Sequence, residues 1–323
     1  MNRNKYLLIF CLIIIIAVAS IKDVNERFYR VALEIPEISK IADEKIEDNA
    51  EIDPKILIDD HNKVVEKPIV KPTTPRPYIT AESYLVANLV TGEKYIDFNS
   101  NKVFPIASVS KLYTALVVHH LFDLEKDIEI KQSALDAYGD AGHLVLGEKF
   151  KPDELLHVLL LESSNDAAVA FADSFGYKEF MEQMNAFAQE IGMSNTKFND
   201  SSGLSPNNVS SALDLLTLTK YLYTSEKGIL DISKKYQIDI ATTTDHGYHH
   251  LTNINPFSMR EDFIGGKTGR TQQAKEAMVS LFNQEINGTV YPIAIIVLRS
   301  DYGEREINTE KLLGQFNEKI LKK

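Results

Sequence analysis

The chain has 323 residues, of which 44% are hydrophobic and 25% are charged, and its formal net charge is −11 at pH 7. These values are typical of a globular protein with enough residues for one large domain or two smaller ones. The negative charge repels phosphates and argues against nucleic acid as a partner. The single cysteine, Cys11, lies near the N-terminus, so we expect no disulfide and no cysteine metal site in the rest of the chain.

The first 77 residues differ in composition from the rest. In residues 1–21, Arg3 and Lys5 precede an uncharged apolar run, which is the layout of a signal peptide or a membrane anchor, and both interpretations remain open. Either one places the rest of the chain outside the cytoplasmic membrane. Residues 22–77 are acidic, then proline-rich, without apolar periodicity, and are typical of a disordered linker. The predicted catalytic domain is therefore 78–323.

From residue 81 onward, the chain shows strand patterns, then a run of helix patterns, and then strand patterns again. Strand patterns lie at residues 83–90, 94–98, 277–282 and 290–299. Helix patterns lie at residues 110–122, 153–161, 166–175, 177–191 and 211–223, and a last one begins near residue 309. Because strands come first and last, we expect an α+β domain whose sheet is assembled from both ends of the chain, with a helical lobe inserted between them. A cleft between the two lobes is then the natural place for a site.

Two Ser-x-x-Lys patterns are candidate pairs of nucleophile and base, because residues three apart on a helix share a face. Ser194 and Lys197 lie in a loop with no buried helix behind them. Ser108 and Lys111 begin the helix pattern at 110–122, which is apolar nearly all round, and free backbone N–H groups surround a residue at a helix N-terminus. This position favours Ser108 as the nucleophile.

The stretch FIGGKTGRT at residues 263–271 admits two interpretations. A phosphate-binding loop of the form G-x-x-x-x-G-K-[ST] needs a glycine five residues before Gly266, and Glu261 occupies that position. The other interpretation makes residues 267–269, Lys-Thr-Gly, one wall of an acyl-transfer site. A Ser-x-Asn pattern at residues 163–165 lies on a corner between two helix patterns, where short polar side chains point into a cleft or simply cap a helix.

In this order, the motifs at residues 108–111, 163–165 and 267–269 resemble the three signatures of the penicillin-recognising serine enzymes. The surrounding segments PIASVSKL, LLLESSNDAAVAFA, FNDSSGLSPNN and GGKTGRT are similar to those of serine-type D-alanyl-D-alanine carboxypeptidases, the low-molecular-mass penicillin-binding proteins. The resemblance covers about residues 81–318. It implies a β-lactamase/transpeptidase-like fold, with an antiparallel sheet of about five strands flanked by helices, and no cofactor.

The resemblance also implies a role for each matched residue. Ser108 attacks the terminal peptide carbonyl, Lys111 acts as its base, and Ser163 relays the proton to the leaving D-alanine. The substrate-binding groups are Asn165 for the amide, Lys267 and Thr268 for the C-terminal carboxylate, Gly269 for close backbone approach, the N–H groups of Ser108 and Arg270 for the oxyanion, and Arg305 as support for the carboxylate site. For Arg305, a surface ion pair is the alternative interpretation.

For Lys111 to act as a base, its surroundings must lower its pKa. A serine hydroxyl is a poor nucleophile until a base removes its proton. Lys111 can do so only when neutral, and an ordinary lysine titrates near 10.4, so its pKa must fall by roughly three units. Burial against the apolar helix and the positive charge of Lys267 are both expected to lower this pKa.

Peptidoglycan stem peptides ending in D-Ala-D-Ala are the substrates that the resemblance implies, and β-lactams are inhibitors that acylate the same serine. A class A-like β-lactamase is an alternative, but those enzymes place a glutamate in an E-x-x-L-N loop, and residues 195–205 contain no glutamate. A penicillin-sensing or wall-binding module that does not turn over is the alternative from another class. An intact catalytic set does not exclude it.

Three further features of the sequence bear on a metal site, on the floor of the cleft and on membrane contact. The segment DHGYHH at residues 245–250 offers metal ligands, but it lies in a loop without a second cluster, so we expect polar surface and no metal. Lys275 stands where the family usually has glycine, which is a departure near the floor of the expected cleft. The C-terminal β-domain and membrane helix of many relatives are absent, so we expect the N-terminal segment to be the contact with the cytoplasmic membrane, on its outer face.

Overall fold

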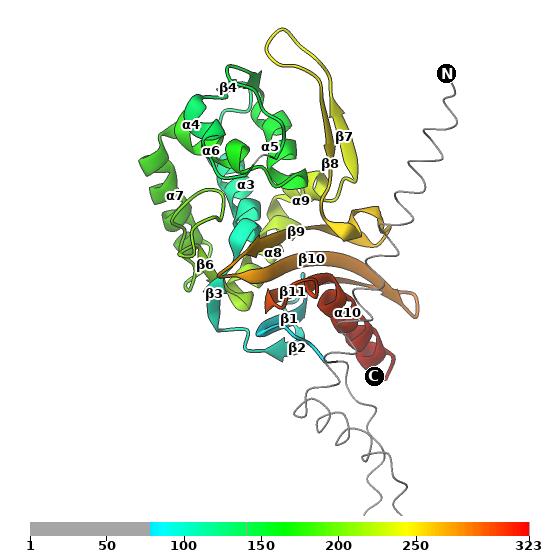
Figure 1. Ribbon diagram of the computed structural model, residues 1–323. Coiled ribbons are helices and arrows are strands. Elements are labelled where there is room, and N and C mark those ends of the chain that lie inside the picture. Colours follow the sequence, from blue (N-terminus) through cyan, green and yellow to red (C-terminus); the bar gives the residue numbers. More distant parts are fainter. Residues whose placement is uncertain (1–77, 140, 323) are drawn as a thin grey trace, which may run out of the picture. The chain divides into compact units, whose positions relative to one another are not determined.

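The computed structural model describes residues 78–139 and 141–322 (Figure 1). The predicted segments 1–21 and 22–77 lie outside the described residues. The strands are β1 (Ser83–Asn88), β2 (Lys94–Phe98), β3 (Val103–Pro105), β4 (Ile128–Glu129), β5 (Lys149–Phe150), β6 (Val209–Ser211), β7 (Gln237–Ile240), β8 (His249–Thr252), β9 (Phe263–Thr271), β10 (Lys275–Ile286) and β11 (Thr289–Ser300). The helices are α3 (Ser110–Leu121), α4 (Gln132–Leu135), α5 (Pro152–Leu161), α6 (Asn165–Phe175), α7 (Tyr177–Glu190), α8 (Ala212–Ser225), α9 (Lys227–Ser233) and α10 (Arg305–Leu321), with 3-10 turns η2 (Ala107–Val109) and η3 (Pro256–Met259).

Five strands form one antiparallel sheet in the order β2-β1-β11-β10-β9. The early strand β1 pairs with the late strand β11, so that Leu85 lies opposite Ile296. Strand β9 is the last strand at its edge of the sheet, and its Lys267 lies opposite Val279 of β10. The predicted sheet of about five antiparallel strands, assembled from both ends of the chain, is confirmed.

The side chains of the sheet alternate between two hydrophobic layers, as a strand period of two requires. On one face Val86 and Ile295 pack with Leu312 and Phe316 of α10. On the other face, residues such as Ile296 belong to the larger core that includes the helical lobe. Figure 1 shows α10 along one face of the sheet and the lobe built around α3 beyond the other. Each fully buried aliphatic side chain contributes about 1.5–3 kcal/mol to this packing.

Helix α3 is the centre of the inserted lobe. Residues 110–118 of this helix are all buried, including the polar Ser110, Lys111 and Thr114, as its apolar pattern predicts. Helices α5, α6, α7 and α9 all contact it. Because α3 is enclosed, a polar side chain on it must find its partners inside the protein.

The structure departs from the predicted elements in several places: strands β3 to β6 and β9 and helices α4 and α9 were not predicted. Helix α10 begins at Arg305, four residues before the predicted start, and strands β10 and β11 extend beyond the predicted ranges. Residues 237–252, which include the DHGYHH segment, form the hairpin of β7 and β8. His246 and His249 of this hairpin are 6% exposed, so the expectation of a polar surface is wrong for these two residues. Within residues 78–139 and 141–322, none of the helices is long and apolar enough to span a bilayer.

Candidate active site

Ser108 and Lys111 form a close pair at the start of α3. Ser108 lies in the 3-10 turn η2 immediately before the helix, and its side chain is partly exposed. Lys111 lies three residues later, and its Nζ donates to Ser108 Oγ at 3.1 Å. The spacing in the sequence therefore predicts the contact. The preceding residue, Ala107, has a φ of +49°, which is an uncommon conformation for alanine and places the serine at a sharp turn.

The ammonium of Lys111 has two further acceptors. Its Nζ lies 2.7 Å from Asn165 Oδ1 and 2.6 Å from the carbonyl oxygen of Ser202. A charged lysine has three N–H donors and uses all of them here. When the amine is neutral, two donors are enough for Asn165 and Ser202, and its lone pair is then free to accept the proton of the Ser108 hydroxyl.

Burial sets the pKa values of the two lysines in the site. It lowers the pKa of Lys111 to about 7, against a weaker opposing effect of the Asp200 carboxylate. The pKa of Lys267 is lowered well below its usual value, first by burial and then by the positive charges of Lys111 and Arg305. The predicted effect of burial on Lys111 is present, whereas the repulsion between the two lysines acts on Lys267.

A loop at residues 199–208 presents the Ser202 carbonyl to Lys111. Asp200 organises this loop: its Oδ1 accepts from the backbone N–H groups of Ser202 at 2.9 Å and Gly203 at 2.6 Å, and its Oδ2 accepts from the N–H of Ser205 at 2.5 Å. Asn208 holds the loop on the helix, since its Nδ2 donates to Asp200 O and to Ser110 Oγ. The carboxylate of Asp200 is thus engaged within its own loop.

The corner between α5 and α6 holds the Ser-x-Asn motif. Ser164 caps α6, because its Oγ accepts from Ala167 N at 3.1 Å, so capping is not the function of Ser163 or Asn165. Ser163 has a φ of +62°, a strained conformation for serine. Asn165 is the first residue of α6, and its Nδ2 donates to the carbonyl of Tyr138 at 2.6 Å while its Oδ1 accepts from Lys111.

Ser163 itself makes no hydrogen bond through its hydroxyl to any of the described residues. The structure therefore brings Ser108, Lys111 and Asn165 into direct contact and leaves Ser163 on the adjacent corner.

The Lys-Thr-Gly motif lies on the edge strand β9, against the turn that holds Ser108. Lys267 is 1% exposed, and its Nζ donates to the Thr268 carbonyl at 3.2 Å. A Cβ added at Gly269 would lie 2.7 Å from Ile106 O and 3.0 Å from Ser108 N. Only glycine allows this close approach between β9 and the backbone of the serine. Arg305 Nη1 donates to Gly269 O at 3.3 Å from the other side.

Arg305 forms an ion pair and also contacts the edge strand. Its Nε pairs with Glu306 at 2.8 Å, while its Nη1 contacts the backbone of β9 and its charge acts on Lys267. Lys275 does not reach these groups: its Nζ pairs with Asp301 at 2.9 Å and with Glu82 at 3.7 Å. The departure at residue 275 therefore adds an ion pair beside α10 and changes none of the contacts described above.

The other motif copies remain outside the site. Ser194 and Lys197 are exposed in the loop that follows α7. No cluster of three or more histidine, cysteine or acidic side chains suited to a metal occurs among the described residues. His249 of the DHGYHH segment instead pairs with Glu148 at 3.1 Å.

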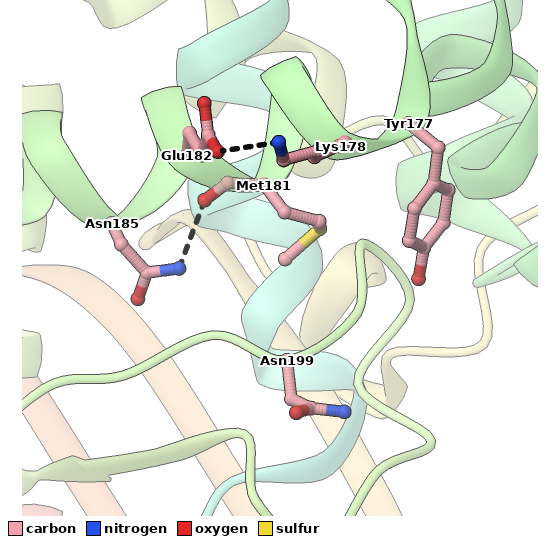
Figure 2. A pocket seen from close by; sticks show the side chains of 6 residues that line it. All are labelled: Tyr177, Lys178, Met181, Glu182, Asn185 and Asn199. Carbon is pink, nitrogen blue, oxygen red and sulfur yellow. Dashed lines mark hydrogen bonds and ion pairs between the residues drawn. The ribbon is translucent and has the colours of Figure 1, made fainter.

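A shallow hollow of about 560 Å³ lies on the outer face of α7 and contains none of the candidate residues. Figure 2 shows its lining, with Tyr177 and Met181 projecting from α7 above Asn199. Lys178 of this hollow is paired with Glu182 at 3.8 Å. The hollow lies beside the loop at 199–208 but does not include Ser108 or Lys111.

Two acceptors of the site were not anticipated from the sequence: the carbonyl groups of Ser202 and Tyr138. Backbone carbonyls carry no side-chain signal. The available signal was the cluster of turn-forming residues in NDSSGLSPNN, which predicts a tight loop but not its contact with Lys111.

The sheet with its inserted lobe, and a serine–lysine pair beside a Lys-Thr-Gly edge strand, define a serine enzyme of the penicillin-recognising class. A family model described as D-alanyl-D-alanine carboxypeptidase matches residues 70–297. The chain belongs to this family of cell-wall hydrolases. The predicted family, fold class and enzyme class, a serine-type D-alanyl-D-alanine carboxypeptidase, are confirmed.

Individual relatives agree with this assignment. The chain is 32% identical over 248 residues to the D-alanyl-D-alanine endopeptidase of Escherichia coli (strain K12), covering 73% of this chain and 76% of the relative. It is 28% identical over 241 residues to D-alanyl-D-alanine carboxypeptidase DacF of Bacillus subtilis (strain 168), covering 72% of this chain and 61% of the relative. The crystal structure of the Streptomyces K15 DD-transpeptidase is similar with a TM-score of 0.67 at 25% identity, over 75% of this chain and 98% of that chain.

Proposed function

We propose that Ser108 is the nucleophile of a D-Ala-D-Ala carboxypeptidase and that Lys111 is its base. Ser108 Oγ attacks the carbonyl carbon of the terminal peptide bond while neutral Lys111 accepts the hydroxyl proton. The carbon–nitrogen bond then breaks, Ser163 donates its hydroxyl proton to the leaving amine and takes in return the proton that Lys111 accepted, and D-alanine departs. Water hydrolyses the resulting ester and restores the serine. The observation that carries this proposal is the 3.1 Å contact between Ser108 and a buried Lys111 whose pKa is about 7.

Strand β9 is the proposed binding edge for the substrate. The close approach at Gly269 supports an oxyanion site formed by the backbone N–H groups of Ser108 and Arg270. Lys267, Thr268 and Arg305 are the proposed groups for the terminal carboxylate. A substrate carboxylate would favour the charged form of Lys267, whose pKa is low in its absence. Asn165, already in contact with Lys111, would hold the substrate amide.

Two assays test the assignment on the full chain. A fluorescent penicillin is expected to label Ser108, and a pentapeptide ending in D-Ala-D-Ala is expected to release many equivalents of D-alanine per molecule. Ser108→Ala is the control that should show neither reaction. Labelling of a residue other than Ser108, or D-alanine release that survives Ser108→Ala, would contradict the assignment.

The same assays separate the alternatives. A penicillin sensor would release at most one equivalent of D-alanine, and a β-lactamase would hydrolyse its ester with penicillin rapidly. The only acidic residue of the 195–205 loop is Asp200, and three backbone N–H groups occupy its carboxylate oxygens. It is therefore poorly placed to activate a hydrolytic water, which favours the carboxypeptidase over the β-lactamase.

Endopeptidase activity is a second candidate, because the 32% identical relative is named a D-alanyl-D-alanine endopeptidase. In this reaction the bond that breaks joins D-alanine to the peptide of a neighbouring strand, and the leaving group is larger than D-alanine. A cross-linked peptide dimer and a pentapeptide, supplied together to the full chain, report both activities in one chromatogram. If the peak of the cross-linked dimer does not decrease, this candidate is rejected, and release of D-alanine from the pentapeptide still supports the carboxypeptidase.

The acylation rate is expected to rise with pH and to level off above about 8. Lys111 acts only when neutral, and burial lowers its pKa to about 7, so each unit of pH below that value should reduce kcat/KM about tenfold. The measurement is kcat/KM for D-alanine release between about pH 5 and pH 10. A profile that keeps rising to pH 10 would mean that the lysine retains its ordinary pKa.

The place of action is also a proposal. The uncharged run after Arg3 and Lys5 supports export and a position on the outer face of the cytoplasmic membrane, where peptidoglycan peptides lie. Fractionation of cells that produce the full chain distinguishes the two open forms, since an anchored chain stays with the membrane and a cleaved one is released.

A further inference from the structure

Arg270 differs from the other arginines of the described chain. Arg260, Arg299 and Arg305 each pair with a carboxylate, at 2.8 Å, 2.7 Å and 2.8 Å. Within residues 78–139 and 141–322, Arg270 has no ion pair, and its side chain is exposed. Its guanidinium lies 5.7 Å from the ring centroid of Tyr302, over the ring face. The arginine is therefore held in place without being neutralised.

The acidic residue paired with Arg270 on the sheet is engaged by another group. Glu276 lies opposite Arg270 in the pairing of β9 and β10, but it is only 3% exposed and its Oε2 accepts from the backbone N–H of Gly303 at 2.9 Å. The ring of Tyr302 is itself tied to β9, because its hydroxyl lies 3.5 Å from Thr271 O. Arg270 and Tyr302 thus form one unit at the C-terminal end of β9.

The position of this unit relative to the proposed carboxylate site indicates its ligand. Arg270 follows Lys267-Thr268-Gly269 directly on the edge strand, and Arg305 contacts the carbonyl between them, on Gly269. The C-terminal half of β9 therefore has two buried or half-buried basic side chains beside it, Lys267 and Arg305, and one exposed basic side chain, Arg270. D-Alanine as a leaving group has a single carboxylate, for which Lys267, Thr268 and Arg305 already provide donors.

We propose that Arg270, held by Tyr302, binds a second carboxylate on the leaving group. The inference rests on the proposed function of Ser108 and on β9 as the binding edge, and it specifies the substrate class: leaving groups that carry an additional acidic group beside the terminal carboxylate. Two sources have this chemistry, namely an acidic D-amino acid at the C-terminus and the acidic peptide of a cross-linked neighbouring strand. A guanidinium suits either, because it offers two parallel donors to a carboxylate.

A matched peptide series tests the proposal with an internal control. Peptides ending in D-Ala-D-Glu and D-Ala-D-Gln differ in the charge of the leaving side chain and hardly in its shape. The full chain is expected to show a kcat/KM ratio of about 5 for Glu over Gln at low salt, and a smaller ratio at high salt. Arg270→Gln keeps the backbone N–H and is expected to bring the ratio to about 1, while Arg270→Lys retains part of it.

Tyr302 variants test whether the ring positions the arginine. Tyr302→Phe keeps the ring and should retain most of the ratio, whereas Tyr302→Ala should lower it toward that of Arg270→Gln. A second arm uses a cross-linked peptide dimer whose neighbouring strand bears either a free or an amidated carboxylate. A preference for the free form in this arm alone assigns the site to cross-links, and a preference in the D-Glu arm alone assigns it to acidic D-amino acids.

The outcomes separate this inference from the function on which it rests. If the full chain cleaves D-Ala-D-Ala but shows a ratio near 1 in both arms, or if Arg270→Gln keeps the ratio of the unaltered chain, the second-carboxylate site is refuted and the carboxypeptidase stands. If the full chain cleaves D-Ala-D-Ala but no peptide of either series, the second-carboxylate site is likewise refuted, and if D-Ala-D-Ala is not cleaved either, the proposed function itself fails.

Discussion

Replacing Lys111 with alanine is expected to lower the rate of Ser108 acylation about 10³-fold. On the proposed assignment the amine is the only base within hydrogen-bond distance of Ser108 Oγ among the described residues, at 3.1 Å. The remaining serine hydroxyl would have to lose its proton to water. The measurement is the second-order rate of covalent labelling by a fluorescent penicillin, followed together with D-alanine release.

The sequence provides a matched control for this variant. Lys197 ends the second Ser-x-x-Lys pattern and is exposed, so Lys197→Ala should acylate at the rate of the unaltered chain. Because Lys111→Ala leaves Asn165 Oδ1 and Ser202 O without a donor, its thermal unfolding must be recorded as well. A folded Lys111→Met variant, which fills the same volume, answers the question if the alanine variant unfolds. Near-normal acylation by either folded variant would exclude Lys111 as the base.

Replacing Gly203 with alanine is expected to destabilise the protein by about 3 kcal/mol, which corresponds to a fall in Tm of roughly 6–12 °C. Gly203 has a φ of +90°, and an added Cβ would lie 2.1 Å from the carbonyl oxygen of Ala107, the residue before Ser108. The loop must therefore move away from the turn η2. Since the Ser202 carbonyl moves with it, acylation should fall even in the fraction that remains folded.

Gly192 gives the matched control for the steric part of this effect. It has the same φ of +90°, but nothing lies within 4 Å of an added Cβ. Gly192→Ala should cost only the roughly 1 kcal/mol of a left-handed non-glycine residue and leave acylation unchanged. Equal losses of Tm in the two variants would show that the contact with Ala107 is unimportant. Circular dichroism melts and penicillin labelling of both variants provide the comparison.

The sequence predicted the contacts that depend on local spacing. Ser108 and Lys111 are three residues apart where a mostly apolar helix begins, and this spacing places Lys111, in the first turn of α3, on the same side as Ser108 in the preceding turn η2. The dipeptide Asn287-Gly288, a type that favours tight hairpin turns, likewise lies between β10 and β11, which pair with each other. Such signals lie within one element and need no knowledge of the rest of the fold.

Features that depend on distant segments were not predictable in this way. The first turn of α10 contains Asn308, whose Nδ2 donates to Ser300 Oγ at 2.6 Å and to Thr80 Oγ1 at 2.8 Å. These long-range contacts stabilise a turn that shows no apolar periodicity of its own, which is why the helix begins earlier than predicted. The burial of His249 has the same origin, since its partner Glu148 is far away in the sequence.

The residues of the candidate site also divide into those that local motifs predict and those that depend on distant segments. The motifs identified the side chains of Lys111, Asn165 and Lys267, and the structure adds how these side chains are held. The carbonyls of Ser202 and Tyr138 complete the surroundings of Lys111 and Asn165, and their positions follow from the path of two loops. A pattern of residue types specifies which groups are present, whereas the path of a loop depends on the packing of the whole domain.

The pairing of β1 with β11 joins the beginning of the described chain to its end, and among the described strands β9 pairs only with β10. A chain that stops before β10 contains Ser108 and Lys111 but has no partner strand to hold Lys267 beside them. Such a fragment would lack reactivity toward penicillin, however much of the helical lobe it contains. On the proposed assignment, covalent labelling of Ser108 would therefore test complete folding, and it would count correctly folded molecules in a mixture that also contains truncated or misfolded ones.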